Sequence, residues 1–362
     1  MNSCRFTYLA LTGLTLSTTA YAGNNGQDVF EFLNLGAGPR QIAMADASVA
    51  LADDASASYY NPAAIGRLTQ NEAAFMDATL FQDAHYDVAD YVYPDHGYGG
   101  FMAGLEYLSY GSVATYDTSG KALGSSTPSD FSFSAGWGNL LFSTLYGGVK
   151  VNYIHENLVA ASANGYGLDL GIQQTQKDSR APLKWSWGAA LQNVGPDVKF
   201  ESASEKLPTA FVLGGGLHML EDKLLFDLDL HQPFNGGTWA SAGTEYWVLN
   251  EIALRFGYRS DQNIGVAATG GVGLKMREVQ VDLALESFGD LGMTYRAGIL
   301  YRFGGPAEDT YKEGLSLMKQ KHYAEAIIKF DEVLKVRPDH MGALQAMRIC
   351  YDKLRATENS HE

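Results

Sequence analysis

The sequence has very little cysteine and, beyond its N-terminus, no long apolar run. Two of its 362 residues are cysteine, and Cys4 lies in a segment that we expect to be removed on export. Cys350 would then be the single thiol, which excludes an intramolecular disulfide and a cysteine-rich metal site. No run of 18 apolar residues follows residue 22, so no transmembrane helix is expected there.

The first 22 residues have the pattern of a secretory signal peptide. Arg5 is followed by the apolar stretch FTYLALTGLTL and then by the small-residue cleavage pattern Ala20-Tyr21-Ala22. The apolar stretch is too short to span a bilayer, which argues against a membrane anchor. We therefore expect export, with cleavage after Ala22.

Positive charge is scarce in the part of the chain that follows. Residues 23–305 carry 16 basic and 31 acidic side chains, and because phosphate binding needs the opposite balance, nucleic acid is excluded as a partner. Residues 306–362 differ, with 9 basic and 10 acidic residues and 2 glycines, against 37 glycines in 23–305. This change in composition predicts a domain boundary at Gly304-Gly305-Pro306.

Between Asn71 and Phe303, apolar residues recur at every second position. One stretch alternates as Val279, Val281, Leu283 and Leu285 against Gln280, Asp282, Ala284 and Glu286. Such alternation places one face of a strand in an apolar medium and the other in a polar one. Two architectures satisfy it: a soluble sandwich with an apolar interior, and an outer-membrane barrel with a polar lumen.

Three features favour the barrel. The segments reach the roughly 9–11 residues that a tilted strand needs to cross a bilayer. Aromatic residues gather near strand ends, as at Tyr246-Trp247 and at Tyr301 with Phe303. The polar face mixes charges of both signs with glycine and alanine, which suits a crowded lumen. The expected strands lie near residues 71–82, 85–93, 98–110, 130–138, 143–156, 164–174, 183–192, 208–219, 223–232, 238–248, 251–259, 264–275, 278–287 and 293–303.

We therefore predict an all-β transmembrane barrel of about 14 antiparallel strands, over residues 71–305, in the cell outer membrane. Its partners would be outer-membrane lipid and the barrel-assembly machinery. The long connections 111–129 and 193–207 are expected outside the cell, and the tight turns in the periplasm. An even number of strands returns both ends to the periplasmic side, so residues 306–362 are expected in the periplasm.

The segment before the first strand, residues 29–66, has no strand alternation. Gly36-Ala37-Gly38 begins a G-x-G pattern, but Pro39 interrupts it and no strand–helix unit follows, so a dinucleotide site is excluded. Asp53-Asp54 lacks the spacing of a calcium loop. The chain has no nucleophile elbow and no zinc-protease motif, and its eight histidines are scattered. We expect no enzyme activity, no cofactor and no bound metal.

Two motif blocks resemble the PorV/PorQ family of outer-membrane proteins, which are relatives of the FadL-type transporters. The blocks are Leu35-Gly36-Ala37-Gly38-Pro39-Arg40 with Ala50-Leu51-Ala52-Asp53-Asp54 and Tyr59-Tyr60-Asn61-Pro62-Ala63, and Ala190-Leu191-Gln192-Asn193-Val194-Gly195-Pro196 with Lys206-Leu207-Pro208 and Leu213-Gly214. The resemblance covers residues 29–303. It implies a 14-stranded barrel whose N-terminal segment folds into the lumen as a plug, and a role in either type IX protein export or small-molecule transport.

We expect residues 23–70 to form this plug, with a structural or gating role as the first interpretation and ligand contact as the alternative. Asn61-Pro62 is expected to end a short helix and turn the chain into the first strand. Because uncompensated charge in a lumen is costly, Asp53 and Asp54 are expected to meet inward-facing arginines. The arginines available are Arg255, Arg259, Arg296 and Arg302. The plug motif residues are Gly36, Gly38, Arg40, Asp53, Asp54, Tyr60, Asn61 and Pro62.

Residues 311–338 have the spacing of a tetratricopeptide-like repeat, with small residues where two helices touch and larger ones in the seam. These packing residues are Gly314, Tyr323, Ala326, Phe330, Val333 and Pro338. A further helix at about 340–355 is expected to cap the repeat, with Ala343, Leu344, Met347 and Tyr351 facing inward. The unit 306–362 either closes the barrel as a helical hairpin or docks a periplasmic or secreted protein.

Two functions remain open at this point. A FadL-type transporter of small hydrophobic molecules needs an apolar pocket, which would involve Phe30, Phe32, Ile42 and Met44 because the inner faces of the strands are mostly glycine, alanine and charged residues. Alternatively, these four side chains form the core of the plug. An export component would use the appended repeat to bind proteins. The sequence favours the PorV-like export role, with small-molecule transport as the alternative.

Overall fold

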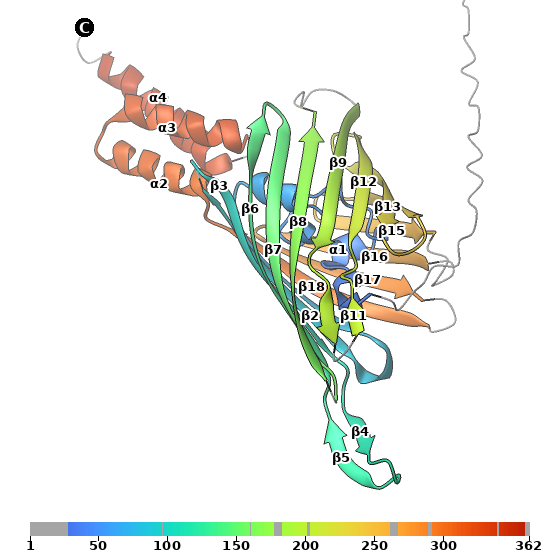
Figure 1. Cartoon of the computed structure of the whole chain (residues 1–362). Helices are drawn as coiled ribbons and strands as arrows, with labels where there is room; N and C mark the ends of the chain where they lie inside the picture. Colours follow the sequence, from blue (N-terminus) through green and yellow to red (C-terminus); the bar gives the residue numbers. More distant parts are fainter. Residues whose placement is uncertain are drawn as a thin grey trace, which may run out of the picture.

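The computed structural model describes residues 28–358, except 96, 160, 177–182, 201–202, 261–266, 289–291 and 339. The expected signal peptide and the first residues of the expected plug lie outside this described part. From Asp28 the chain passes through the interior of a β-barrel, then forms the barrel strands, and ends in three helices (Figure 1).

In the described residues, fourteen antiparallel strands form a closed barrel, in which β1 pairs with both β2 and β18 (Figure 1). The strands are β1 (Asn71–Thr79), β2 (His85–Asp95), β3 (Gly99–Ser109), β6 (Ser129–Phe142), β7 (Leu145–Asn157), β8 (Ser162–Thr175), β9 (Leu183–Val194), β12 (Ala210–Met219), β13 (Leu224–Pro233), β14 (Trp239–Trp247), β15 (Ile252–Arg259), β16 (Ala267–Met276), β17 (Val279–Ser287) and β18 (Met293–Phe303). The predicted fold class and the predicted number of strands are confirmed.

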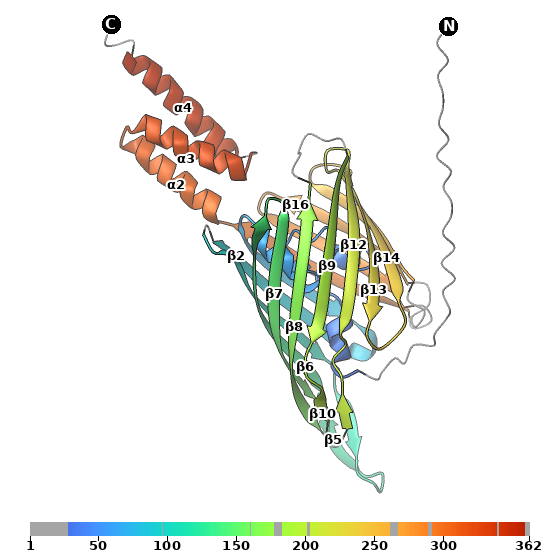
Figure 2. The same cartoon turned by 45° about the horizontal axis from the view of Figure 1, so that its top comes forward.

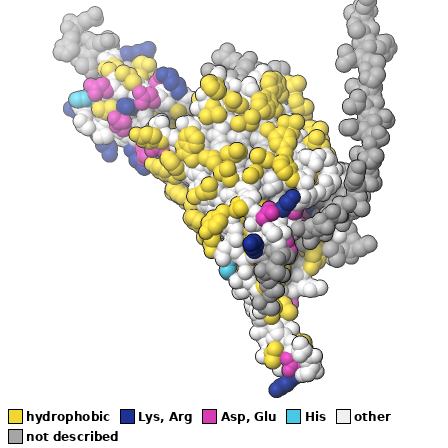
Figure 3. Space-filling view, viewed as in Figure 1, with side chains coloured by type: hydrophobic (Ala, Val, Ile, Leu, Met, Phe, Trp, Pro, Cys, Tyr) yellow, Lys and Arg dark blue, Asp and Glu magenta, His cyan; other side chains and the backbone are white. Residues whose placement is uncertain are grey.

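The alternation along the strands places apolar side chains outside and polar ones inside. On β17, Leu283 and Leu285 are 51% and 42% exposed, whereas Asp282 and Glu286 are buried in the lumen. On the face of the barrel seen in Figure 3, the outer surface is accordingly rich in hydrophobic side chains. A soluble sandwich would have the reverse arrangement, so the faces of the strands decide between the two architectures in favour of the barrel.

The two ends of the barrel differ in their connections. One end carries the long connections, which contain two short hairpins that the alternation pattern did not predict: β4 (Val113–Tyr116) with β5 (Ala122–Ser126), and β10 (Val198–Phe200) with β11 (Ala203–Glu205). The opposite end has tight turns, such as the one between β16 and β17, and carries the three helices (Figure 2). We call these the long-loop end and the short-turn end.

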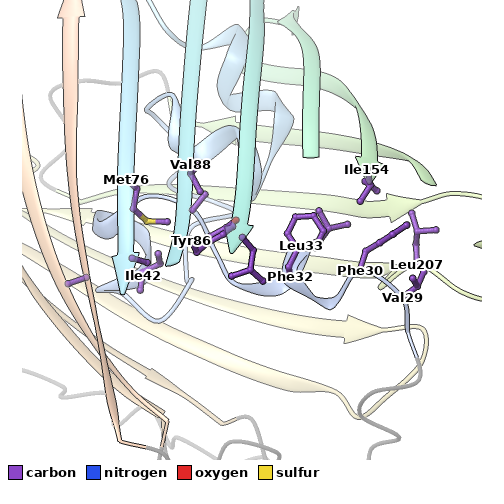
Figure 4. Packing of buried hydrophobic residues seen from close by; sticks show 14 of the residues in the cluster. Val29, Phe30, Phe32, Leu33, Ile42, Met76, Tyr86, Val88, Ile154 and Leu207 are labelled. Atoms are coloured by element: carbon purple, nitrogen blue, oxygen red, sulfur yellow. The ribbon is translucent and has the colours of Figure 1, made fainter. Parts of the chain in front are cut away.

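Residues 28–66 fill the interior of the barrel and form the plug. Its short helical turns are η1 (Glu31–Asn34), α1 (Pro39–Ile42), η2 (Ser56–Tyr59) and η3 (Pro62–Gly66). Phe30, Phe32 and Ile42 pack with inward side chains of the barrel wall, including Met76 and Tyr86, in one buried cluster (Figure 4). Met44 is equally buried in a second, smaller cluster. These four apolar side chains therefore form plug core, as the alternative interpretation expected.

The last three helices are α2 (Pro306–Lys319), α3 (Tyr323–Val336) and α4 (Met341–Glu358). Gly314 is buried where α2 meets α3, and a Cβ atom there would lie 2.6 Å from the ring of Phe330. Ala326 and Val333 share this core with Tyr323 at its edge, and exposed Pro338 follows the end of α3. No helix in the described part is long and apolar enough to cross a membrane.

The inward face of α4 differs from the expected one. Ala343 and Met347 pack against the core as expected, but Leu344 is 42% exposed and Tyr351 is 50% exposed. Ala346 and Cys350 take the inward positions instead. The prediction for Leu344 and Tyr351 was wrong because the sequence of α4 carries two apolar stripes, and the smaller side chains fit the close contact with α3.

Candidate functional site: the plug and the lumenal cavities

The tyrosine pair of the plug motif joins three parts of the plug. The Tyr59 hydroxyl accepts a hydrogen bond from the backbone N–H of Gly36 at 3.1 Å and donates to the Leu33 carbonyl. The Tyr60 hydroxyl accepts one from the N–H of Ala37 at 3.1 Å and donates to the Asp46 carboxylate at 2.6 Å. Burial raises the pKa of Tyr60 well above its usual value, so its hydroxyl stays protonated and available as a donor.

The two glycines of the motif make these contacts possible. Gly36 and Gly38 have φ angles of +80° and +76°, a region that favours glycine. A Cβ atom on Gly36 would also lie 2.8 Å from the Asp46 carboxylate, and one on Gly38 would lie 2.7 Å from the side chain of Ser56. Any other residue at these positions would push the plug segments apart.

Arg40 is the direct partner of the acidic pair. Its guanidinium contacts Asp53 at 2.5 Å and Asp54 at 3.1 Å, and it binds both carboxylate oxygens of Glu245 on β14 at 2.9 and 3.0 Å. Gln41 adds hydrogen bonds to Asp54 at 2.8 and 2.9 Å. The expected pairing of Asp53 and Asp54 with arginines of the barrel wall is therefore corrected. Arg40 lies on α1, inside the plug itself, and contacts both carboxylates directly.

The four wall arginines do face the lumen, but they hold other partners. Arg255 pairs with Glu245 at 2.6 Å and with Asp282 at 2.7 Å, within the wall. Arg302 pairs with Glu72 at 2.8 Å, and the second oxygen of Glu72 accepts a hydrogen bond from the N–H of Ala55 in the plug. Both arginines thus act on the plug through an intervening carboxylate.

The other two wall arginines contact the plug directly. Arg259 reaches Asp46 of the plug at 2.9 Å and Glu286 on β17 at 3.2 Å. Arg296 pairs with Glu286 at 2.6 Å and donates to the Leu35 carbonyl at 2.5 Å. These contacts connect β15, β17 and β18 to the plug, so the wall and the plug share one network of charges.

Asn61 fixes the plug to the opposite side of the barrel. Its side-chain NH2 donates to the Val49 carbonyl at 2.9 Å and to the Ile172 carbonyl on β8 at 3.0 Å, and its oxygen accepts from the N–H of Ala63. Asn61 therefore caps η3 after η2 has ended, and the chain enters β1 only after a further helical turn. The plug passes so close to the wall here that a Cβ atom on Gly171 would lie 2.1 Å from the Asn61 side chain.

A cavity of about 400 Å³ lies on the long-loop side of the plug. We call it the outer cavity. Plug residues such as Gly36, Asp46 and Tyr60 line it from one side, and residues near the long-loop ends of strands, including Ala210 and Trp239, line it from the other. Its wall mixes aromatic rings with charged and amide side chains. Phe30, Phe32, Ile42 and Met44 do not line it, because all four are buried in the core of the plug.

A second cavity of about 470 Å³, the inner cavity, lies at the short-turn end. Arg40, Asp53 and Arg67 line it from the plug, together with tryptophans 185 and 247 from the barrel wall. Among the described residues, none lines both cavities. The plug lies between the two cavities, and its charge network reaches both, with Asp46 at the outer cavity and Arg40 at the inner one.

Sequence reasoning missed most of the carboxylates that hold the plug. Glu245 and Glu286 each receive two arginines, and Asp229 accepts backbone hydrogen bonds from Ser48 and Val49. All three occupy inward positions of alternating strands, which is the signal that could have identified them. No cluster of three or more histidine, cysteine or acidic side chains in the described part is arranged to hold a metal ion.

The sequence matches the model of the uncharacterised protein family UPF0164 over residues 11–136, which extend through the plug and β1 to β3 into β6. No curated protein matches the chain. Among solved structures, the chain is similar to the deltaS2 mutant of the TodX monoaromatic hydrocarbon channel, with 14% identity and a TM-score of 0.54 over 73% of this chain and 98% of that one.

Two further solved structures show the same architecture. The CymD monoaromatic hydrocarbon channel is 12% identical, with a TM-score of 0.53 over 74% of this chain and 98% of that one. The toluene transporter TbuX of Ralstonia pickettii is 16% identical, with a TM-score of 0.51 over 74% and 99%. At these identities the similarity establishes the fold, a closed antiparallel β-barrel of 14 strands.

Proposed function

We propose that this protein is an outer-membrane transporter for small molecules with an apolar part, a FadL-type role that the sequence alone ranked second. The observation that carries the proposal is the outer cavity, which lies between the long-loop end and a plug that is tied to the barrel wall. The structures with a similar fold are described as hydrocarbon channels and a toluene transporter. No enzymatic step is part of the proposal.

The orientation follows from the loop lengths. The long-loop end faces the medium and the short-turn end faces the periplasm, as is usual for barrels of this class. A ligand enters the outer cavity from the medium, and the plug must shift before the ligand reaches the inner cavity. Helices α2 to α4 then lie in the periplasm, below the exit.

The test is uptake with a plug that can be locked. Ser48→Cys and Asp229→Cys, in a Cys350→Ala background, join the plug to β13, where the Ser48 N–H lies 2.8 Å from the Asp229 carboxylate. We expect oxidation to stop uptake of toluene or benzylammonium into porin-deficient cells, and reduction to restore it. Ser48→Cys alone is the matched control. Failure of both probes to enter through the unlocked protein would contradict the proposal.

Protein export remains the second candidate, because α4 carries an uncovered stripe. Met341, Leu344 and Tyr351 are exposed on one face of the helix, and Arg348 and Arg355 continue the same face. An apolar stripe flanked by arginines fits an amphipathic partner helix with acidic residues. The tetratricopeptide-like spacing of residues 311–338 in the sequence supports such a docking role.

This second candidate has its own test. Leu344→Glu and Tyr351→Glu, introduced together, reverse the character of the stripe without touching the helical core. If the stripe docks an export component, one defined periplasmic or secreted protein co-purifies with the wild type and is lost from the double variant. Gln345→Glu, an exposed change on the same helix, is the control. An unchanged set of partners would remove this candidate.

A further inference from the structure

The cationic side chains of the outer cavity are already neutralised by the protein. Lys150 lies 3.0 Å from Asp169. Arg259 pairs with Asp46 and Glu286, and Arg296 pairs with Glu286. A ligand carboxylate would have to compete with these buried acids for the same cations, and it would add negative charge to a wall that already has more acids than bases. The cavity therefore disfavours anionic ligands.

Two buried side chains in the same wall retain acceptor capacity. Glu106 is 6% exposed and accepts a hydrogen bond from the Tyr86 hydroxyl at 3.0 Å, and no ion pair of Glu106 occurs in the described part of the chain. Asn152 is 4% exposed and donates to Asp169, while its side-chain oxygen has no hydrogen-bond partner among the described residues. Buried polar atoms are almost always paired, so the side-chain oxygen of Asn152 indicates a donor that the described residues do not supply. The Glu106 carboxylate can accept further hydrogen bonds beside the one from Tyr86.

The aromatic lining of the cavity suits a positive charge. The ammonium of Lys150 lies 5.4 Å from the ring centre of Tyr59, and the guanidinium of Arg259 lies 5.4 Å from that of Trp239. Both rings line the outer cavity. Cation–π attraction at such distances is a recurring way to recognise ammonium groups. The cavity thus combines acceptor atoms with ring faces that attract cations.

We propose that the outer cavity binds an organic ammonium compound with a flat or apolar part. The ammonium donates hydrogen bonds to Glu106 and to the side-chain oxygen of Asn152, and the apolar part lies against Tyr59. A primary ammonium has three donors and no acceptor, which matches the unpaired oxygen of Asn152 and the remaining acceptor capacity of Glu106. This inference rests on the proposed function because it names the ligand class of the same cavity.

The test uses four probes of nearly equal size: benzylammonium, benzyl alcohol, toluene and benzoate. Their affinities for the purified full-length protein in detergent are measured by equilibrium dialysis. We expect the affinity to decrease in the order given, with benzylammonium at least tenfold tighter than toluene. Glu106→Gln is expected to lower the affinity for benzylammonium at least tenfold and to change the affinity for toluene less than twofold. Asn152→Ala should lower the affinities for both benzylammonium and benzyl alcohol.

The control is Asp130→Asn, which removes the same charge from a buried inward side chain that does not line the outer cavity. It should leave all four affinities unchanged, and heat-dependent gel mobility of each variant checks that the barrel is folded. If toluene binds most tightly and its affinity is unchanged by Glu106→Gln, this inference is overturned and the proposed transport function stands. If none of the four probes binds, both fail. Tight benzylammonium binding that is insensitive to Glu106 and Asn152 would also overturn the assignment.

Discussion

The lumen and the helical unit contain the same kinds of ion pairs in opposite surroundings. In the lumen, Arg40, Arg255 and Arg296 are almost fully buried, and each contacts at least one equally buried carboxylate. On the helices, pairs such as Lys335 with Asp331 are largely exposed to solvent. Water screens the exposed pairs, whereas a buried charge that loses its partner remains uncompensated.

The difference shows what holds the plug. The plug packs apolar side chains against the wall, and it also carries buried charges whose partners lie on the wall strands. The helical unit depends instead on a small apolar core around Phe330. Substitutions of charged residues should therefore act strongly in the lumen and weakly on the helices, and substitutions that alter packing should disturb the helical unit.

The largest effect is expected for Arg40→Ala. It leaves Asp53, Asp54 and Glu245 without their shared cation, and the loss of one partner from a buried pair costs about 3–5 kcal/mol. We expect a lower free energy of unfolding, measured by urea-dependent tryptophan fluorescence, and larger single-channel conductance in planar bilayers. A variant as stable and as closed as the wild type would show that the network does not hold the plug.

The next largest effect is expected for Gly314→Val. The added side chain meets the Phe330 ring and forces α2 away from α3, with a cost of about 2–3 kcal/mol for an overpacked contact. Cys350 reports the change, because it is fully buried and burial raises the pKa of its thiol. We expect faster reaction of Cys350 with a thiol reagent in the variant, and unchanged gel mobility of the barrel. In the control Ser316→Ala, an exposed change on α2, Cys350 should react as slowly as in the wild type.

Tyr60→Phe should have a smaller effect, of about 1–2 kcal/mol, because it removes one hydroxyl and leaves Ala37 and Asp46 without that partner. The pKa of Tyr60 is raised in the folded state by burial, so folding favours the protonated form. Its contribution to stability is therefore constant below about pH 10 and falls as the pH rises further. Urea titrations of both proteins at pH 7 and pH 11 measure the difference, which should shrink at the higher pH.

The smallest effect is expected for Lys329→Ala. This side chain contacts Glu313 and Glu332 at 3.2 and 3.3 Å on the surface of the helices. Because exposed pairs of this kind contribute little, we expect no measurable shift of the urea midpoint. A shift comparable to that of Arg40→Ala would remove the distinction between the buried and the exposed networks.

The barrel could be predicted from the sequence because its signal is repeated in each strand. Every strand has one face toward lipid and one toward the lumen, and the resulting alternation marks its position. The hairpins β4–β5 and β10–β11 were missed because they are short, and β4 and β5 have no buried face. On α4, the prediction placed Leu344 and Tyr351 inward, but packing against α3 selected the stripe with Ala346 and Cys350.

The contacts of the candidate site were less predictable. The motif Gly36 to Pro62 was recognised as plug, but the partner of Asp53 and Asp54 was not, because several arginines can compensate a carboxylate and the sequence does not order them by distance. A turn of the plug places α1 beside residues 53 and 54, and Arg40 therefore becomes their partner. The outer cavity depends on side chains from many strands, and no local pattern connects Glu106 with Asn152.

The most direct test of the plug is the accessibility of Ala57, which is fully buried inside the barrel. An Ala57→Cys variant in a Cys350→Ala background is treated with a small, charged thiol reagent in intact outer membranes. We predict that the introduced thiol is protected in the otherwise wild-type protein and reacts readily when Arg40→Ala is added. Rapid labelling without Arg40→Ala would contradict a plug held in the lumen by this network.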